Sequence, residues 1–164
     1  MLSGAAFSSL RCLFILLTFL SVGCATSAPP KAQVDMREYF HPNGLVIKLN
    51  DDLSATETEN GFLVEPSDGS NRNVRFPIEI RVSLIKNKKL PENASFKRKD
   101  VGNRKIDYSI EKTDGGSGGE TYTFRAFEKT ADGYLEFLQT SQSEYSEPDF
   151  QTVWKIIENT SPQK

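Results

Sequence analysis

Several short segments of the chain have the residue pattern of β-strands in which one face is buried. In residues 78–84, every second residue from Ile78 to Leu84 is aliphatic and the residues between them are polar or charged. A strand exposes alternate side chains on opposite faces, so we expect these aliphatic side chains to lie in a core. By alternation or by β-rich composition, we predict strands at residues 45–49, 61–65, 78–84, 104–111, 121–127 and 134–139.

The last part of the chain has the periodicity of an amphipathic helix. Phe150, Val153, Trp154 and Ile157 recur at spacings of three, four and seven residues, which places them on one helical face. Ser146 has a side chain suited to the N-cap of this helix, and the residues after the helix are polar. A short second helix at residues 34–39 is a further expectation.

This order of elements predicts an α+β fold. Many strands followed by one packing helix indicate a single antiparallel β-sheet whose one face is covered by the C-terminal amphipathic helix.

The N-terminal residues have the layout of an export signal. Arg11 precedes an apolar run, and small residues then lead to Cys24. The ending at residues 22–24, Val-Gly-Cys, resembles the lipobox of bacterial lipoproteins, in which the cysteine is lipidated and becomes the first mature residue. Ser21 stands where lipoboxes most often have leucine, so ordinary signal cleavage near residues 25–28 stays open, as does an uncleaved anchor. The anchor is disfavoured because the apolar run is shorter than the roughly 20 residues that span a bilayer.

We therefore expect a lipoprotein signal peptide at residues 1–23, a flexible tether at residues 24–38 and one α+β domain at residues 39–164. Small and polar residues with two consecutive prolines make up the tether. Cys24 would carry the lipid and hold the protein on a membrane facing the periplasm. Because alanine follows the cysteine, the enterobacterial sorting rules that this pattern resembles favour the outer membrane.

The residue inventory disfavours several kinds of chemistry. The chain has two cysteines, Cys12 and Cys24, and neither lies in the predicted domain, so no disulfide and no zinc site is expected there. His41 is the one histidine, and it directly precedes a turn, which suits a surface or turn residue better than a catalytic one. We expect no enzyme activity, cofactor or metal. The 22 acidic residues leave a carboxylate-pair hydrolase as an alternative. A net charge of −2 argues against nucleic acid as a partner.

A glycine-rich segment lies between two of the predicted strands. It lacks the G-x-x-x-x-G-K-[ST] pattern of a phosphate-binding loop and is followed by a strand, so we do not expect nucleotide binding. It is either a flexible hairpin connection or a binding loop. The candidate partner-binding residues are Asp114, Gly115, Gly116, Ser117, Gly118, Gly119 and Glu120.

The glycine-rich segment, the aromatic strand at residues 122–124, the strand at residues 134–139 and the ending at residues 149–158 together resemble one family. They are similar to the periplasmic immunity proteins that neutralise a type VI secretion muramidase effector. The opening at residues 42–45 and 61–62 also resembles that family.

The resemblance implies a PsbP-like α+β fold and a function without catalysis. The protein would bind a secreted peptidoglycan hydrolase and occlude its active cleft, and a homodimer is left open. The alternative is a PsbP-like envelope lipoprotein that assists assembly of a membrane or cell-wall complex.

Overall fold

The computed structural model describes residues 35–70, 77–86, 90, 95–115, 119–131, 133–144 and 146–162. All of them belong to one compact unit, Gln33–Lys164. The predicted signal peptide and Cys24 lie outside the described residues, as do Gly116, Ser117 and Gly118. Within the described ranges, the model has no helix with the length and apolar composition needed to cross a membrane.

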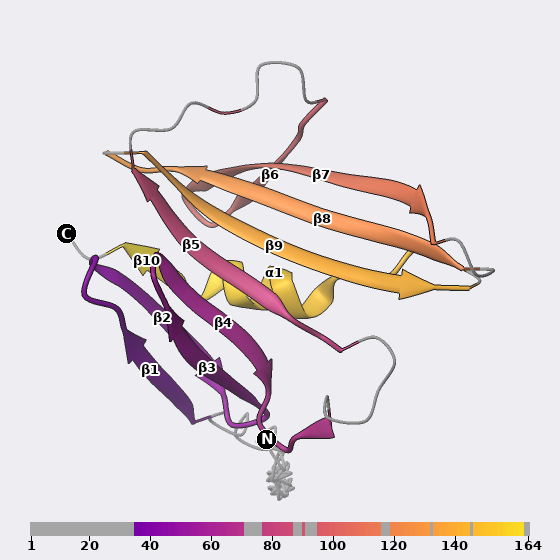
Figure 1. The fold of residues 1–164 in the computed structure, drawn as a ribbon. Helices are drawn as coiled ribbons and strands as arrows, with labels where there is room; N and C mark the ends of the chain where they lie inside the picture. Colours follow the sequence, from indigo (N-terminus) through magenta and orange to yellow (C-terminus); the bar gives the residue numbers. More distant parts are fainter. Residues whose placement is uncertain are drawn as a thin grey trace, which may run out of the picture. The chain divides into compact units, whose positions relative to one another are not determined.

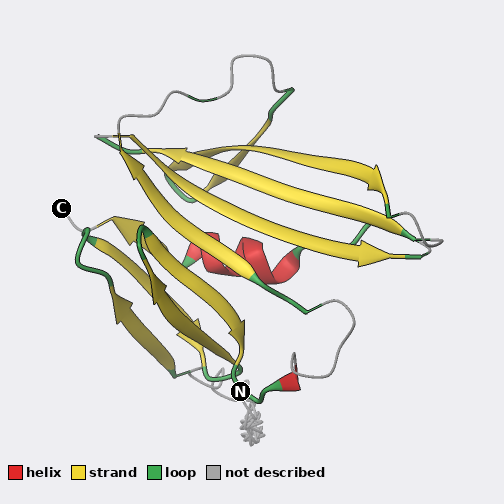
Figure 2. Ribbon diagram, viewed as in Figure 1, coloured by secondary structure: helices red, strands yellow, loops and turns green. Residues whose placement is uncertain are grey.

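Two antiparallel sheets and one helix make up the described fold (Figures 1 and 2). The large sheet has seven strands in the order β3-β4-β5-β9-β8-β7-β6, and the small sheet has three in the order β1-β2-β10. The strands of the large sheet are β3 (Leu53–Thr58), β4 (Gly61–Pro66), β5 (Ile80–Lys86), β6 (Lys97–Val101), β7 (Arg104–Asp114), β8 (Glu120–Lys129) and β9 (Gly133–Ser143). Those of the small sheet are β1 (Met36–Phe40), β2 (Leu45–Asn50) and β10 (Thr160–Pro162).

Five of the six predicted strands lie within observed strands of these two sheets, whereas the predicted strand at residues 78–84 begins two residues before β5. β7, β8 and β9 form an antiparallel meander. In β8, alternate side chains from Tyr122 to Ala126 are buried, as expected for a strand with one face on a core. Ile80 and Val82 of β5 are fully buried, but Ile78 lies before the strand and is 44% exposed, so its predicted core position is wrong.

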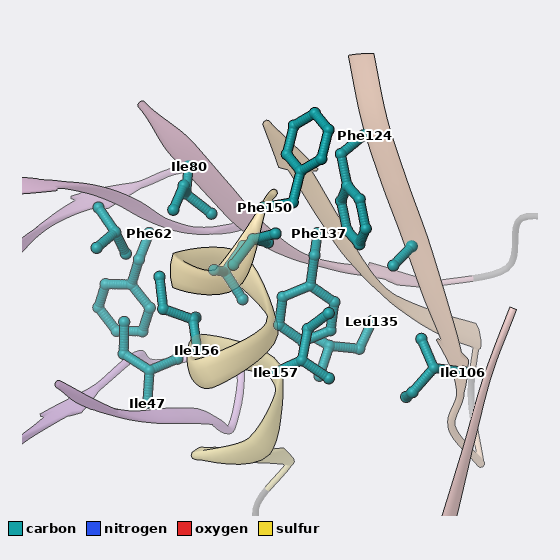
Figure 3. Packing of buried hydrophobic residues seen from close by; sticks show 14 of the residues in the cluster. Ile47, Phe62, Ile80, Ile106, Phe124, Leu135, Phe137, Phe150, Ile156 and Ile157 are labelled. Carbon is teal, nitrogen blue, oxygen red and sulfur yellow. The ribbon is translucent and has the colours of Figure 1, made fainter. Parts of the chain in front are cut away.

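Helix α1 (Gln151–Glu158) packs its apolar face into the core with side chains from both sheets (Figure 3). Val153 and Ile157 are fully buried, and Trp154 packs against the cluster while partly exposed. The ring of Phe150 is buried 5.2 Å from that of Phe124. The predicted apolar stripe is therefore confirmed, with Ile156 as an additional buried member.

Tertiary packing moves the start of the helix away from the predicted cap at Ser146. The helix begins at Gln151, whose backbone N–H donates to Oδ1 of Asp149 at 3.1 Å. Phe150, the residue before the helix, has φ 51°, a left-handed conformation that costs free energy for any residue with a Cβ. Burial of the phenyl ring offsets that cost. A prediction based on polar N-cap residues, such as Ser146, takes no account of this burial.

Three further expectations are corrected by the small sheet. The helix expected at residues 34–39 is wrong, because Met36–Phe40 is the strand β1, which begins within the predicted tether. The residues after α1 are not a plain polar tail, because β10 pairs with β2. The fold therefore has two sheets where the sequence indicates one.

Candidate functional site

The glycine-rich segment joins β7 and β8 at one end of the large sheet (Figure 1). The two strands stay paired up to Asp114 and Glu120, and the N–H of Gly115 donates to the carbonyl of Gly119 at 2.8 Å. A Cβ on Gly115 would lie 2.6 Å from that carbonyl oxygen, so the closure requires glycine. The pairing shows that the segment joins the two strands of a β-hairpin and brings Asp114, Gly115, Gly119 and Glu120 together, while its role as a binding loop stays a prediction.

At the base of this hairpin, the carboxylate of Glu120 is held by two neighbours. Tyr122 donates its hydroxyl to Oε2 of Glu120 at 2.5 Å, and Lys112 forms an ion pair with Oε1. The hydrogen bond from Lys112, followed by that from Tyr122, lowers the pKa of Glu120 below its ordinary value. The same contacts raise the pKa of Lys112 and of Tyr122. Glu120 is thus a fixed, ionised group, while the side chain of Asp114 lies exposed across the strand pair.

The register also separates charge along the large sheet, which the linear sequence does not reveal. Asp114, Glu120 and Glu144 lie at the hairpin end, which we call the acidic end. Lys86 of β5 and Lys129 of β8 lie at the other end of the large sheet, where they pair with Gly133 and Tyr134 at the start of β9. Lys112 lies at the same end and pairs with Glu120, so Asp114 and Glu144 leave this end with an excess of negative charge.

His41 has a structural role in the turn between β1 and β2. Its Nε2 donates to the carbonyl of Thr58 at 2.8 Å, and its Nδ1 accepts from the N–H of Asn43 at 3.2 Å. The residue is 8% exposed, so the turn position is confirmed but the surface position is wrong. Both ring nitrogens are therefore hydrogen-bonded to the backbone, so neither is available as a general base in this conformation. The described part of the chain contains no cluster of three metal-ligating side chains.

Comparison with known proteins points to a single family. The model of the type six secretion immunity 3 domain matches residues 46–161. The chain is 30% identical over 118 residues to "Immune protein Tsi3" of Pseudomonas aeruginosa, a match that covers 72% of this chain and 77% of that protein.

Two solved structures resemble the fold at low sequence identity. A crystal structure from Bacteroides thetaiotaomicron superposes with a TM-score of 0.59 at 17% identity, over 78% of this chain and 48% of that one. The chain thus spans about half the length of that protein, and the likeness concerns the fold alone. The solution structure of cyanobacterial PsbP (CyanoP) from Synechocystis matches 85% of this chain and 99% of its own, but with 12% identity and a TM-score of 0.34. The PsbP-like arrangement therefore stays a prediction.

The family model matches residues 46–161, a range that contains the hairpin, the helix and the whole large sheet. The chain is therefore a member of the type six secretion immunity 3 family.

Proposed function

We propose that this immunity protein binds a secreted peptidoglycan hydrolase in the periplasm and occludes its active cleft without catalysis. Membership of the immunity family supports binding to a secreted effector. The observation that carries the choice of mode is the β7–β8 hairpin, whose ends are glycines at the acidic end of the large sheet.

The shape of the hairpin suits insertion into a groove. β7 and β8 support it over the full pairing from Ile106 to Asp114, so its base is rigid. Gly115 and Gly119 add no side-chain bulk at the point where the loop leaves the strands. Because β7 and β8 are already paired up to Asp114 and Glu120, this part of the hairpin loses little further conformational entropy when it enters a cleft.

The charge of the hairpin indicates the chemistry of the surface that it meets. Asp114 and Glu120 would accept hydrogen bonds from donors in the cleft, with Ser117 as the further polar group that the sequence supplies. Since Glu120 is already ionised and held by Lys112, it would meet the partner without a change of protonation. Complementary charge would also speed association at low ionic strength.

The same proposal covers location. Cys24 would be lipidated and residues 24–38 would lead from the outer membrane to the domain, so the inhibitor would lie in the compartment where the toxin acts. A Cys24→Ser variant should then leave the membrane fraction and appear as soluble periplasmic protein, and membrane retention would contradict this part.

The central test is a wall-digestion assay with the secreted effector that wild-type protein captures from an envelope extract. Replacing Gly115–Gly119 by Asn-Gly would keep Asp114 opposite Glu120 across a two-residue turn, which suits the twist of paired strands. We expect the variant to melt as the wild type does and to lose most of its inhibition. Asp114→Asn should weaken inhibition, whereas the control Glu38→Gln, an exposed acid of β1, should not.

Full inhibition by the shortened variant would refute the role of the hairpin. If the wild-type protein neither binds nor inhibits the hydrolase but copurifies with resident envelope machinery, the accessory-lipoprotein function is the better one.

A further inference from the structure

Strand β1 forms an outer edge of the small sheet, and two large apolar side chains of this strand are exposed (Figure 1). Met36 is 42% exposed and Phe40 is 60% exposed. They share one face of the strand with Glu38, because alternate side chains point the same way. Tyr39 points the other way, and its ring lies 6.4 Å from that of Phe62 in the core. The outer face of β1 thus has an apolar side chain on either side of a glutamate.

The other edge strands of the described sheets have features that discourage further pairing. β6 exposes four consecutive charged residues at 97–100, and β10 has three residues and ends in proline. β3 ends in three exposed polar residues at 56–58. Charge, proline and short length commonly protect the unpaired backbone groups of an edge.

Strand β1 lacks this protection. It has five residues and no proline, and its two charged side chains are already paired within the chain. Arg37 lies 2.9 Å from Asp51, and Lys48 lies 2.6 Å from Glu38. Among the described residues, no strand pairs with the outer side of β1. This edge is therefore suited to receive a further strand.

The residue order of β1 makes it complementary to a second copy of itself. In a symmetric antiparallel pair, residues opposite each other share a face of the sheet, so the twofold axis must pass through one residue. With the axis at Glu38, Met36 of each copy lies opposite Phe40 of the other. An axis at Arg37 or Tyr39 would instead place Glu38 opposite one of the two apolar side chains.

We infer that β1 is a self-association surface, through which two copies of this protein pair their β1 strands around Glu38. The pairing continues the small sheet from one copy into the other, in the order β10-β2-β1-β1-β2-β10. The same surface serves both copies, as twofold symmetry requires. The two contacts between Met36 and Phe40 remove apolar surface from water.

The charge on the axis gives this register a distinctive signature. The two Glu38 side chains lie opposite each other, and like charges in that position destabilise a strand pair. Lys48 pairs with Glu38 in each copy, so the row across the dimer holds two cations and two carboxylates and has no net charge. Removing the charge of Glu38 should therefore strengthen the dimer, whereas removing the ring of Phe40 should weaken it.

Sedimentation equilibrium of the full chain tests this inference, with Cys24→Ser in every sample to remove the expected lipid site. A single strand pair is a small interface, so the concentration range should extend to about 1 mM, where we expect the chain to be partly dimeric. Phe40→Ser should raise the dimer Kd by roughly tenfold or more, because the loss occurs twice. Its melting temperature should stay close to that of the wild type, because Phe40 lies mostly in solvent.

Two further variants complete the test. Ile78→Ser is the matched control, because Ile78 is 44% exposed but lies before β5, and this variant should leave the Kd unchanged. Glu38→Gln should lower the Kd by about two- to fivefold.

A chain that stays monomeric throughout this range would overturn the inference. Equal weakening by Ile78→Ser and Phe40→Ser would also overturn it, as would a weaker dimer in Glu38→Gln. If the chain is monomeric and Phe40→Ser lowers its affinity for the captured effector, the edge receives the effector and the inference is wrong. The proposed function is tested separately, because occlusion by the hairpin does not require a dimer.

Discussion

Arg104 joins the large sheet to the end of α1 and to the small sheet, and its replacement should cost much of the stability of the fold. From β7, Nη1 donates to Oε2 of Glu128 at 2.9 Å and to the carbonyl of Thr160 at 2.6 Å. Nη2 donates to the carbonyl of Ile157, in the last turn of α1. One guanidinium thus neutralises a carboxylate and satisfies two carbonyls on separate elements.

The Arg104→Met variant keeps the aliphatic stem and removes all three hydrogen bonds. The side chain of Glu128 is 11% exposed, so its carboxylate would be left without a partner in a poorly hydrated site. Removing one member of a buried ion pair typically costs 3–5 kcal/mol. Arg104 is 24% exposed, which lets solvent screen part of that loss, so we expect about 3 kcal/mol and a melting temperature lower by roughly 10 °C.

The pH dependence of the loss gives a sharper check. Burial already raises the pKa of Glu128, and the attraction of Arg104 offsets part of that rise. Without Arg104 the folded-state pKa of Glu128 should rise further above its unfolded value. The folded state then holds the proton more tightly, so stability falls as pH rises from the unfolded value through the raised pKa. Urea unfolding of wild type and Arg104→Met should show a larger difference at pH 8 than at pH 5.

A double variant supplies the control. Adding Glu128→Leu to Arg104→Met removes the unpaired carboxylate, so the double variant should be more stable than Arg104→Met alone. A loss below about 1 kcal/mol, a loss that is flat with pH, or simple additivity of the two substitutions would refute this account.

Further predictions concern the sheet glycines and the hairpin charges. A Cβ on Gly133 would lie 2.0 Å from the carbonyl oxygen of Ile85, so Gly133→Ala should lower the free energy of unfolding by about 2 kcal/mol, whereas Gly119→Ala, with 3.6 Å of room, should be nearly neutral in the same urea titration. Glu120 has a lowered folded-state pKa, so its stabilising contribution is present above its unfolded pKa and disappears as pH falls through the lowered value. Stability measured between pH 5 and pH 2 should therefore decline less steeply in Glu120→Gln than in wild type.

Local pattern was enough to predict the strands of the central meander and the helix stripe. Each of these elements buries one face. The alternation from Ile106 to Ile110 and the spacing from Val153 to Ile157 therefore indicate which side chains face the core. The edge strand β6 has no such pattern of alternating apolar residues. It reads Lys-Arg-Lys-Asp-Val, and what holds it as a strand is pairing with β7, including the bidentate contact of Arg98 with Asp107.

The candidate site divides in the same way. Asp114 to Glu120 could be located from glycine composition, because a glycine run between two strands is a local signal. The row of side chains across the large sheet that includes Ser109, Arg125 and Arg81 could not be predicted, because these residues are far apart in the sequence and only strand register aligns them. Cross-strand neighbours are a tertiary property, and a single-residue slip would send each side chain to the other face.

The position of β2 between β1 and β10 has a consequence for how the molecule folds. β2 pairs with the first described strand on one side and with the last on the other. Closing the second pairing brings together residues more than a hundred positions apart, as Ile47 and Thr160 are, and such distant contacts cost loop entropy and slow folding. The small sheet can be completed only after Pro162 has been synthesised. A chain of this design cannot complete its second sheet until residues 160–162 are available to pair with β2.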